Sequence, residues 1–167
     1  MLSGLLTERL RLRPLVLADA PFILCLVNDP HWIKFIGDRG VSNLEDARQF
    51  IIYGPQRMYA ELGHGMLLVE TLEHGSAIGL CGLLKREYLD CPDLGFAFMP
   101  EYRGKGYAEE ASIGVLEDAK AVFSKIAATT ALDNRPSITL LGKLGFEFSK
   151  IIQLNKDDPG TRLFMRS

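Results

Sequence analysis

The sequence predicts a single α/β domain, residues 1–167, built on a mixed and mostly antiparallel sheet. Residues 65–71 and 77–85 are apolar segments on either side of a turn-forming sequence, which predicts an antiparallel hairpin. An apolar segment at 94–99 then leads through a glycine-containing turn into a long amphipathic segment, which predicts a strand followed by a helix. This order differs from the regular strand-helix alternation of a doubly wound sheet.

The composition is that of an ordinary soluble chain. Of its 167 residues, 47% are hydrophobic and 24% are charged, and the formal net charge is -2. This charge provides no basic field of the kind that nucleic-acid binding requires. The N-terminus has no signal pattern, and no apolar run approaches the ~20 residues that cross a bilayer. We therefore expect a cytoplasmic protein that binds neither nucleic acid nor membrane.

The cysteines and histidines do not have the spacing of metal ligands. Cys25, Cys81 and Cys91 are odd in number and form no C-x-x-C pair, so we expect reduced thiols that serve as small buried hydrophobic side chains. No two histidines stand four residues apart. The sequence predicts no metal site.

The first half of the chain predicts one strand and two helical regions. Residues 10–13 alternate leucine with arginine, which is typical of a half-buried strand. Residues 17–28 predict a helix. Ser42 and Glu45 have the spacing of a capping box, which predicts a helix from Ser42 to about residue 59 that Pro55 ends or kinks.

A short apolar cluster at residues 31–36 lies between these helical regions. It contains Trp32 and Phe35, and a glycine-containing loop follows it. The two side chains are candidates for the wall of a cleft, and packing in the core is the alternative.

The second half predicts a strand-helix-strand unit and a closing hairpin. Residues 105–123 predict a helix and residues 126–132 a strand, so that the strands before and after this helix form a locally parallel pair. Residues 134–144 predict a short helix, and 146–154 and 161–165 predict two final strands. We expect six to seven strands and about four helices.

The turn before the long helix is a candidate anion site. The amides of the first helical turn have no intrahelical acceptor, the helix dipole adds positive charge, and glycines allow close approach of the backbone. Two basic residues add charge suited to phosphate. The alternative is a tight turn whose basic residues are simply solvated. The residues of this turn are Arg103, Gly104, Lys105, Gly106, Tyr107 and Ala108.

Two nucleotide-binding motifs match this turn less well. The dinucleotide fingerprint G-x-G-x-x-G would use Gly104 and Gly106, with Asp133 at the end of the next strand as the acid, but Glu109 stands in place of the third glycine. The P-loop string G-x-x-x-x-G-K-[ST] is absent.

Three blocks of the sequence resemble the GCN5-related N-acetyltransferase (GNAT) superfamily. The turn at 103–108 matches R-x-x-G-x-[GA], and residues 134–146 resemble N-x-x-S-x-x-[LV]-x-x-K-x-G-F. Residues 7–13, TERLRLR, resemble the start of the ribosomal-protein N-terminal acetyltransferase (RimJ/RimL-type) subgroup. The resemblance implies acetyl transfer from acetyl-CoA to a primary amine, with no metal.

The resemblance also implies where acetyl-CoA binds. The turn at 103–108 would hold the pyrophosphate, and Asn134 would bond the pantetheine arm unless it serves only as a helix cap. The central strand and the strand from residue 126 would splay apart, leaving backbone groups around Phe98 and Met99 free for the pantetheine amides and the thioester carbonyl.

The catalytic residues that the resemblance implies depart from the family pattern. Asp93 stands where relatives often carry a glutamate base, and a solvated turn carboxylate is the alternative. Glu110 is a second family acidic position, explained equally by solvation or capping. Leu141 stands in place of the tyrosine that usually protonates the departing thiol. Ser137 would then orient the sulfur of coenzyme A, and capping of its own helix is the alternative role.

The acceptor and the state of assembly are less defined by the sequence. Trp32, Phe35 and Tyr88 are candidate acceptor-binding residues, for a protein N-terminal amine or a small-molecule amine. We expect a monomer or a homodimer. A catalytically silent acyl-CoA-binding domain is the alternative function, and a dinucleotide-binding enzyme is a weaker one.

Overall fold

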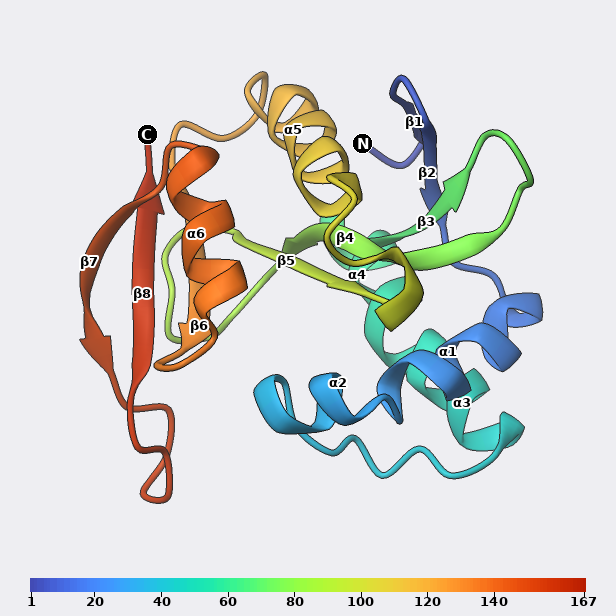
Figure 1. Cartoon of the computed structure of the whole chain (residues 1–167), viewed down its shortest axis with the longest axis horizontal. Coiled ribbons are helices and arrows are strands. Elements are labelled where there is room, and N and C mark those ends of the chain that lie inside the picture. Colours follow the sequence, from blue (N-terminus) through green and yellow to red (C-terminus); the bar gives the residue numbers. More distant parts are fainter.

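An eight-stranded sheet runs through the molecule in the order β1-β2-β3-β4-β5-β6-β8-β7 (Figure 1). The computed structural model describes residues 1–167. Only β5 and β6 pair in parallel, so the predicted mixed, mostly antiparallel sheet is confirmed. The strands are β1 (Leu5–Leu6), β2 (Leu10–Pro14), β3 (Met66–Thr71), β4 (Ala77–Leu84), β5 (Asp93–Phe98), β6 (Ile126–Ala131), β7 (Glu147–Ile152) and β8 (Thr161–Arg166).

The strand beyond the expected six to seven is β1. It has two residues and pairs with β2 through Leu5 opposite Leu12 and Leu6 opposite Arg11. Two residues are too few to show the alternation that predicts a strand, so no pattern in the sequence marks it.

The four expected helical regions are present, and two of them are divided. The first becomes a 3₁₀ turn, η1 (Leu17–Asp19), and α1 (Ala20–Val27), with the cluster at 31–36 forming α2 (Pro30–Phe35). Pro55 does not end the second region but lies inside a π-helical turn. This local change in the helix is expected because proline has no backbone N–H to donate to the preceding turn. The remaining elements are α3 (Leu44–Ile51), η2 (Ile52–Gln56), α4 (Arg57–Leu62), η3 (Pro100–Tyr102), α5 (Tyr107–Ala119) and α6 (Arg135–Lys143).

The cap of α3 lies one residue later than predicted. Asn43, not Ser42, is the N-cap, and its side-chain oxygen accepts from the amide of Asp46 at 2.8 Å. The Asp46 carboxylate in turn accepts from the amide and hydroxyl of Ser42. Asp46 therefore takes the role that the sequence assigned to Glu45, and its carboxylate satisfies the amide of Ser42 that Glu45 was expected to satisfy.

Two apolar clusters pack against the sheet, one on each face. One includes Ala111 and Val115 of α5 and Leu141 of α6 with side chains from β2–β6. The other includes Ile23 of α1, Trp32 of α2 and residues of α3. Figure 1 shows α6 beside β6–β8 on one side of the molecule and α1–α3 on the other, with β5 between them. None of the helices has the length and apolar character that a membrane crossing requires.

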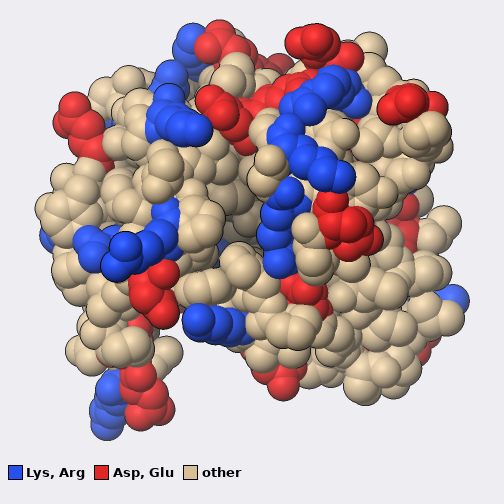
Figure 2. Space-filling view, viewed as in Figure 1, with Lys and Arg blue, Asp and Glu red and all other residues tan.

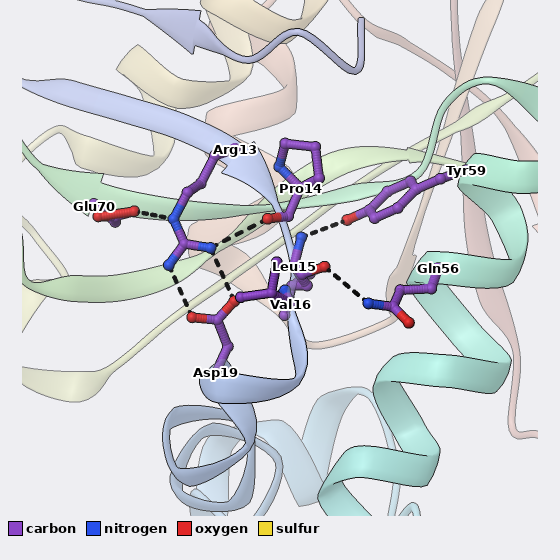
Figure 3. A network of polar contacts seen from close by, with 8 residues as sticks. All are labelled: Arg13, Pro14, Leu15, Val16, Asp19, Gln56, Tyr59 and Glu70. Carbon is purple, nitrogen blue, oxygen red and sulfur yellow. Dashed lines mark hydrogen bonds and ion pairs between the residues drawn. The ribbon is translucent and has the colours of Figure 1, made fainter.

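A polar network joins the segment between β2 and α1, and also α4, to the sheet (Figure 3). The guanidinium of Arg13 donates to both carboxylate oxygens of Asp19, at 2.8 and 2.9 Å, and also to Glu70. The hydroxyl of Tyr59 accepts from the amide of Leu15 at 3.1 Å and donates to the carbonyl of Met66. One tyrosine thus joins α4 to the segment after β2 and to the start of β3.

We predict that Tyr59→Phe lowers the free energy of unfolding by about 1–3 kcal/mol, because an amide and a carbonyl lose their partner in a partly buried site. Tyr53→Phe is the matched control, since Tyr53 is 70% exposed. Urea denaturation followed by circular dichroism measures both. Equal stability of the two variants would contradict the role given to Tyr59.

Candidate active site

The parallel strands β5 and β6 pair at one position and then diverge. Asp93 lies opposite Ala127, and the Ala127 amide donates to the carbonyl of Pro92 at 2.8 Å. No other pair joins the two strands, whereas β4 and β5 pair at six positions. The splayed central strands expected from the resemblance are therefore present.

The divergence frees the amide of Phe98, which is one of the expected groups, but not the backbone groups of Met99. The Met99 amide donates to the Ile78 carbonyl at 2.9 Å, and the Phe98 carbonyl accepts from Nε of Arg103 at 3.0 Å. Because hydrogen-bonding directions alternate along a strand, the groups of Phe96 and the amide of Phe98 point toward β6. These groups, and not those of Met99, face the gap.

A cleft of about 1370 Å³ opens at this divergence. Figure 2 shows a hollow in the middle of this face, with Lys and Arg side chains around it. Met99 and Lys105 are the two predicted site residues outside its lining. The structure brings the other predicted residues together in the lining: Trp32, Phe35, Tyr88, Asp93, Phe98, Arg103, Gly104, Gly106, Tyr107, Ala108, Asn134 and Ser137.

The start of α5 presents a row of free amides to this cleft. The first backbone amide of the segment with an acceptor is that of Glu110, which donates to the Gly106 carbonyl at 3.0 Å. The amides of residues 104–109 have no acceptor within the chain. Gly104 and Gly106 adopt φ angles of 71° and 81°, a conformation that favours glycine. The geometry is that of an anion site at a helix N-terminus.

The N-terminal block of the sequence holds this turn in place. Glu110 accepts from the Thr7 hydroxyl at 2.6 Å, from the Arg9 amide at 2.7 Å and from Arg9 Nε at 2.6 Å. Arg9 also donates to the Lys105 carbonyl at 3.0 Å. Burial opposes ionisation of Glu110, but these hydrogen bonds outweigh it and lower the pKa of the carboxyl. Glu110 is thus a structural partner of residues 7–9 and not a freely solvated surface acid.

Arg103 ties the turn to the opposite wall of the cleft. Its guanidinium donates to the buried carboxylate of Asp29, in addition to the Phe98 carbonyl. Asp29 is the N-cap of α2 and accepts from the amides of His31 and Trp32. The charge of Arg103 is therefore paired within the chain, and this pair gives Arg103 a positioning role beside the expected one in holding an anion.

Asp93 is a buried carboxylate with one oxygen unused. Its side chain is 3% exposed, Oδ2 accepts from Nε of Arg86 at 3.1 Å, and Oδ1 has no partner. Burial raises the pKa of Asp93 to about 6, against the lowering effect of Arg86 and the smaller one of the nearby Thr129 backbone. Such a carboxylate is ionised near neutral pH and poised to accept a proton. It is not a solvated turn residue.

All three buried side-chain polar atoms that lack a partner belong to residues of the cleft. They are Nε1 of Trp32, Oδ1 of Asp93 and Oγ1 of Thr130. Buried polar groups are normally hydrogen-bonded, so this concentration indicates a place for a ligand. The chain holds no group of three or more His, Cys, Asp or Glu placed to bind a metal ion.

The short helix α6 forms the third side of the cleft. Asn134 is its N-cap, with Oδ1 accepting from the Ser137 amide at 3.5 Å, which leaves the side-chain NH₂ without an acceptor. The Ser137 hydroxyl makes no hydrogen bond, so it does not cap the helix. Leu141 is 1% exposed and packs in the core.

This arrangement is shared with known proteins. A family model described as an acetyltransferase (GNAT) domain matches residues 9–147. The chain belongs to the GNAT acetyltransferase family. The protein YkkB of Bacillus subtilis (strain 168), described as uncharacterized, is 31% identical over 158 residues, which cover 90% of this chain and 89% of that protein.

Solved GNAT structures share the fold at lower identity. The microcin C7 self-immunity acetyltransferase MccE, solved in complex with acetyl-CoA and AMP, is 15% identical with a TM-score of 0.81, over 95% of this chain and 92% of its own. The ribosomal-protein-S5-alanine acetyltransferase of Vibrio fischeri is 19% identical with a TM-score of 0.78, over 98% and 95%. At these identities the likeness is one of fold.

Sequence reasoning missed several residues of this GNAT site. Arg39, Arg86 and Thr130 line the cleft, but none of them belongs to a recognisable motif. Arg86 follows β4, the second strand of the hairpin, and the end of β4 pairs with the start of β5 at Asp93. The predicted antiparallel order could therefore have indicated that Arg86 and Asp93 lie close together. Arg39 comes from a loop whose path no local pattern determines.

Proposed function

We propose that this protein transfers an acetyl group from acetyl-CoA directly to a primary amine in a ternary complex. The observation that carries the proposal is a single cleft with the free amides of residues 104–109 at one end and the unpaired Oδ1 of Asp93 within it. The free amides can bind a diphosphate, and the carboxylate of Asp93 can accept a proton from an amine.

Residues of this chain fit acetyl-CoA along its length. The amides of residues 104–109 would hold the pyrophosphate, the strand edge at Phe96 and Phe98 would bond the pantetheine amides, and the NH₂ of Asn134 would add a donor. The MccE complex with acetyl-CoA supports this choice of cosubstrate. When bound, its thioester supplies the acetyl group.

Direct transfer is supported by the thiols of the chain. No cysteine lines the cleft, and burial raises the pKa of Cys81 to about 12, so a covalent acetyl-cysteine step has no candidate. The carboxylate of Asp93 accepts the proton of the amine, and the Ser137 hydroxyl is free to orient the departing sulfur.

The acceptor class remains a protein N-terminal amine or a small-molecule amine. The opening residues 7–13 and the shared fold with the Vibrio fischeri ribosomal-protein acetyltransferase support the former. The three free cysteines support a cytoplasmic setting for either.

One observation favours a catalytically silent acyl-CoA-binding domain instead. Leu141 stands where many GNAT enzymes place a tyrosine, and a leucine in this place offers no hydroxyl donor to the cleft. A dinucleotide-binding enzyme has no such support, because the sheet is not doubly wound and Asp133 is a solvated surface acid.

Release of free thiol from acetyl-CoA is expected in the presence of suitable amines. A panel of peptide N-termini, amino acids, polyamines and aminoglycosides is assayed with a thiol reagent, and acetyl-CoA binding is measured by calorimetry. Tight binding with no thiol release from any amine would replace the enzyme assignment by the silent one. No binding would remove both.

We predict that Gly106→Val weakens acetyl-CoA binding at least tenfold. A side chain at φ 81° strains the turn, and its Cβ would lie 3.3 Å from the Arg9 guanidinium. Gly63→Val is the matched control, because Gly63 has φ 73° at the end of α4 and lies outside the cleft. Calorimetry with coenzyme A separates lost binding from general strain, and unchanged affinity would count against the turn as the diphosphate site.

The pH dependence of turnover tests Asp93. The carboxylate form accepts the proton, so its fraction rises about tenfold per pH unit below the pKa of about 6 and levels off above it. We expect the ratio of kcat/KM between wild type and Asp93→Asn to follow this curve, since ionisation of the amine is common to both proteins. A ratio independent of pH between 5 and 8 would remove Asp93 as the base.

A further inference from the structure

We propose that the acceptor carries an anionic group, a carboxylate or a phosphate, close to its reactive amine, and that Arg39 and Arg86 bind this group. The inference rests on the proposed acetyl transfer and narrows its substrate class. It is carried by unsatisfied donors on the acceptor side of the cleft.

Arg39 differs from the other arginines of the chain. Most of them form an ion pair or donate to a carbonyl, and only Arg11, Arg39 and Arg135 make no such contact. Of these three, Arg39 alone lines the cleft. An arginine without a partner inside a concave site is a donor available to a ligand.

Two glycines and an acid surround Arg39 in the loop between α2 and α3. Gly37 and Gly40 on either side have φ angles of 119° and 66°, which favour glycine. The Gly40 amide donates to the carboxylate of Asp38 at 2.8 Å, so this neighbouring acid is bonded to its own loop and does not pair with Arg39. The loop keeps the guanidinium at the cleft without neutralising it.

Arg86 places a second guanidinium on the same side. One of its nitrogens, Nε, donates to Oδ2 of Asp93, and the other two make no hydrogen bond. Both guanidinium groups line the cleft, and burial, and next the charge of Arg86, lower the pKa of Arg39, so the two cations lie close enough to repel each other. An anion there would relieve this repulsion and receive the planar, paired donors that guanidinium groups offer.

None of the acids that line the cleft forms an ion pair with Arg39. Asp158 accepts from the Leu154 and Gly160 amides and from the Thr161 hydroxyl, and Asp133 lies 4.0 Å from Lys34. The indole Nε1 of Trp32 adds a buried, unpartnered donor to the same cleft. With Oδ1 of Asp93 receiving the amine, the pocket is complementary to a molecule that is cationic at one point and anionic at another.

Matched pairs of acceptors test the preference. L-Methionine is compared with L-methioninamide, O-phosphoethanolamine with ethanolamine, and a tripeptide amide having Asp in second place with the same peptide having Asn. We expect kcat/KM at least tenfold higher for the anionic member of one pair or more, and the pair that responds distinguishes carboxylate from phosphate.

Substitution of Arg39 assigns the preference to this site. Arg39→Gln should reduce kcat/KM about tenfold or more for the preferred anionic acceptor and less than twofold for its neutral partner, with acetyl-CoA affinity unchanged. Arg39→Lys should retain an intermediate preference, because the charge remains but the paired donors are lost. Arg11→Gln is the matched control, since Arg11 is exposed on β2, unpaired and outside the cleft.

Binding of the same compounds to protein saturated with coenzyme A is measured by calorimetry, so the result does not depend on turnover. No thiol release from any acceptor would contradict the proposed acetyl transfer alone. Equal binding and equal rates within every pair, or Arg39→Gln behaving like Arg11→Gln, would overturn the anion site while leaving acetyl transfer intact.

Discussion

The separation of β5 from β6 after one paired position is the constraint on which the candidate site depends. Paired strands would satisfy each other's backbone groups along their whole length, and no cleft would exist between them. Because pairing stops at Asp93 and Ala127, the edge of β5 beyond that point is open to a ligand. Asp93 lies at the base of the opening, where it is still buried by the paired strands. One irregularity in the sheet therefore creates both the binding edge and the desolvated carboxylate.

The turn before α5 is held from two directions, and this joins the two halves of the cleft. On one side, Glu110 receives three hydrogen bonds from Thr7 and Arg9. On the other, Arg103 pairs with Asp29, which caps the helix that carries Trp32. Removing either partner of the Arg103–Asp29 pair would leave a charge in a largely buried place, which is costly. The turn before α5 and the α2 wall are thus positioned together, as the proposed transfer between two bound molecules would require.

Prediction from sequence succeeded where local patterns determine structure. The order of strands, the glycine turn and the α6 cap at Asn134 each follow from residues that are neighbours in the chain, and a match to 103–108 and 134–146 together indicated the family. The functions of charged side chains did not follow in this way. The local pattern around Arg103 indicated a phosphate ligand but gave no sign of its distant partner Asp29.

The same limit applies to the site's other corrections. Whether the amide of Met99 is free depends on which neighbouring strand it faces, and that is decided by pairing with Ile78 in β4. The cap of α3 was misplaced by one residue because Ser42 and Asn43 are both good caps and the choice depends on the path of the preceding loop. The unpaired state of Arg39 is a property of the whole charge arrangement, and no short pattern encodes it.

Arg86 connects acceptor recognition with the chemistry at Asp93. In the free protein its positive charge partly offsets the effect of burial on the Asp93 carboxyl, and so keeps the pKa near 6 and not higher. An anion bound by Arg39 and Arg86 would neutralise part of that positive field, because the same guanidinium bonds both groups. The lowering influence on the pKa of Asp93 would weaken, and its carboxylate would become a stronger base when the acceptor is in place. A basic residue beside a catalytic acid normally makes that acid a weaker base. If an anionic acceptor binds as proposed, it would reverse this effect, and Asp93 would become the strongest base only where an amine is present to be deprotonated.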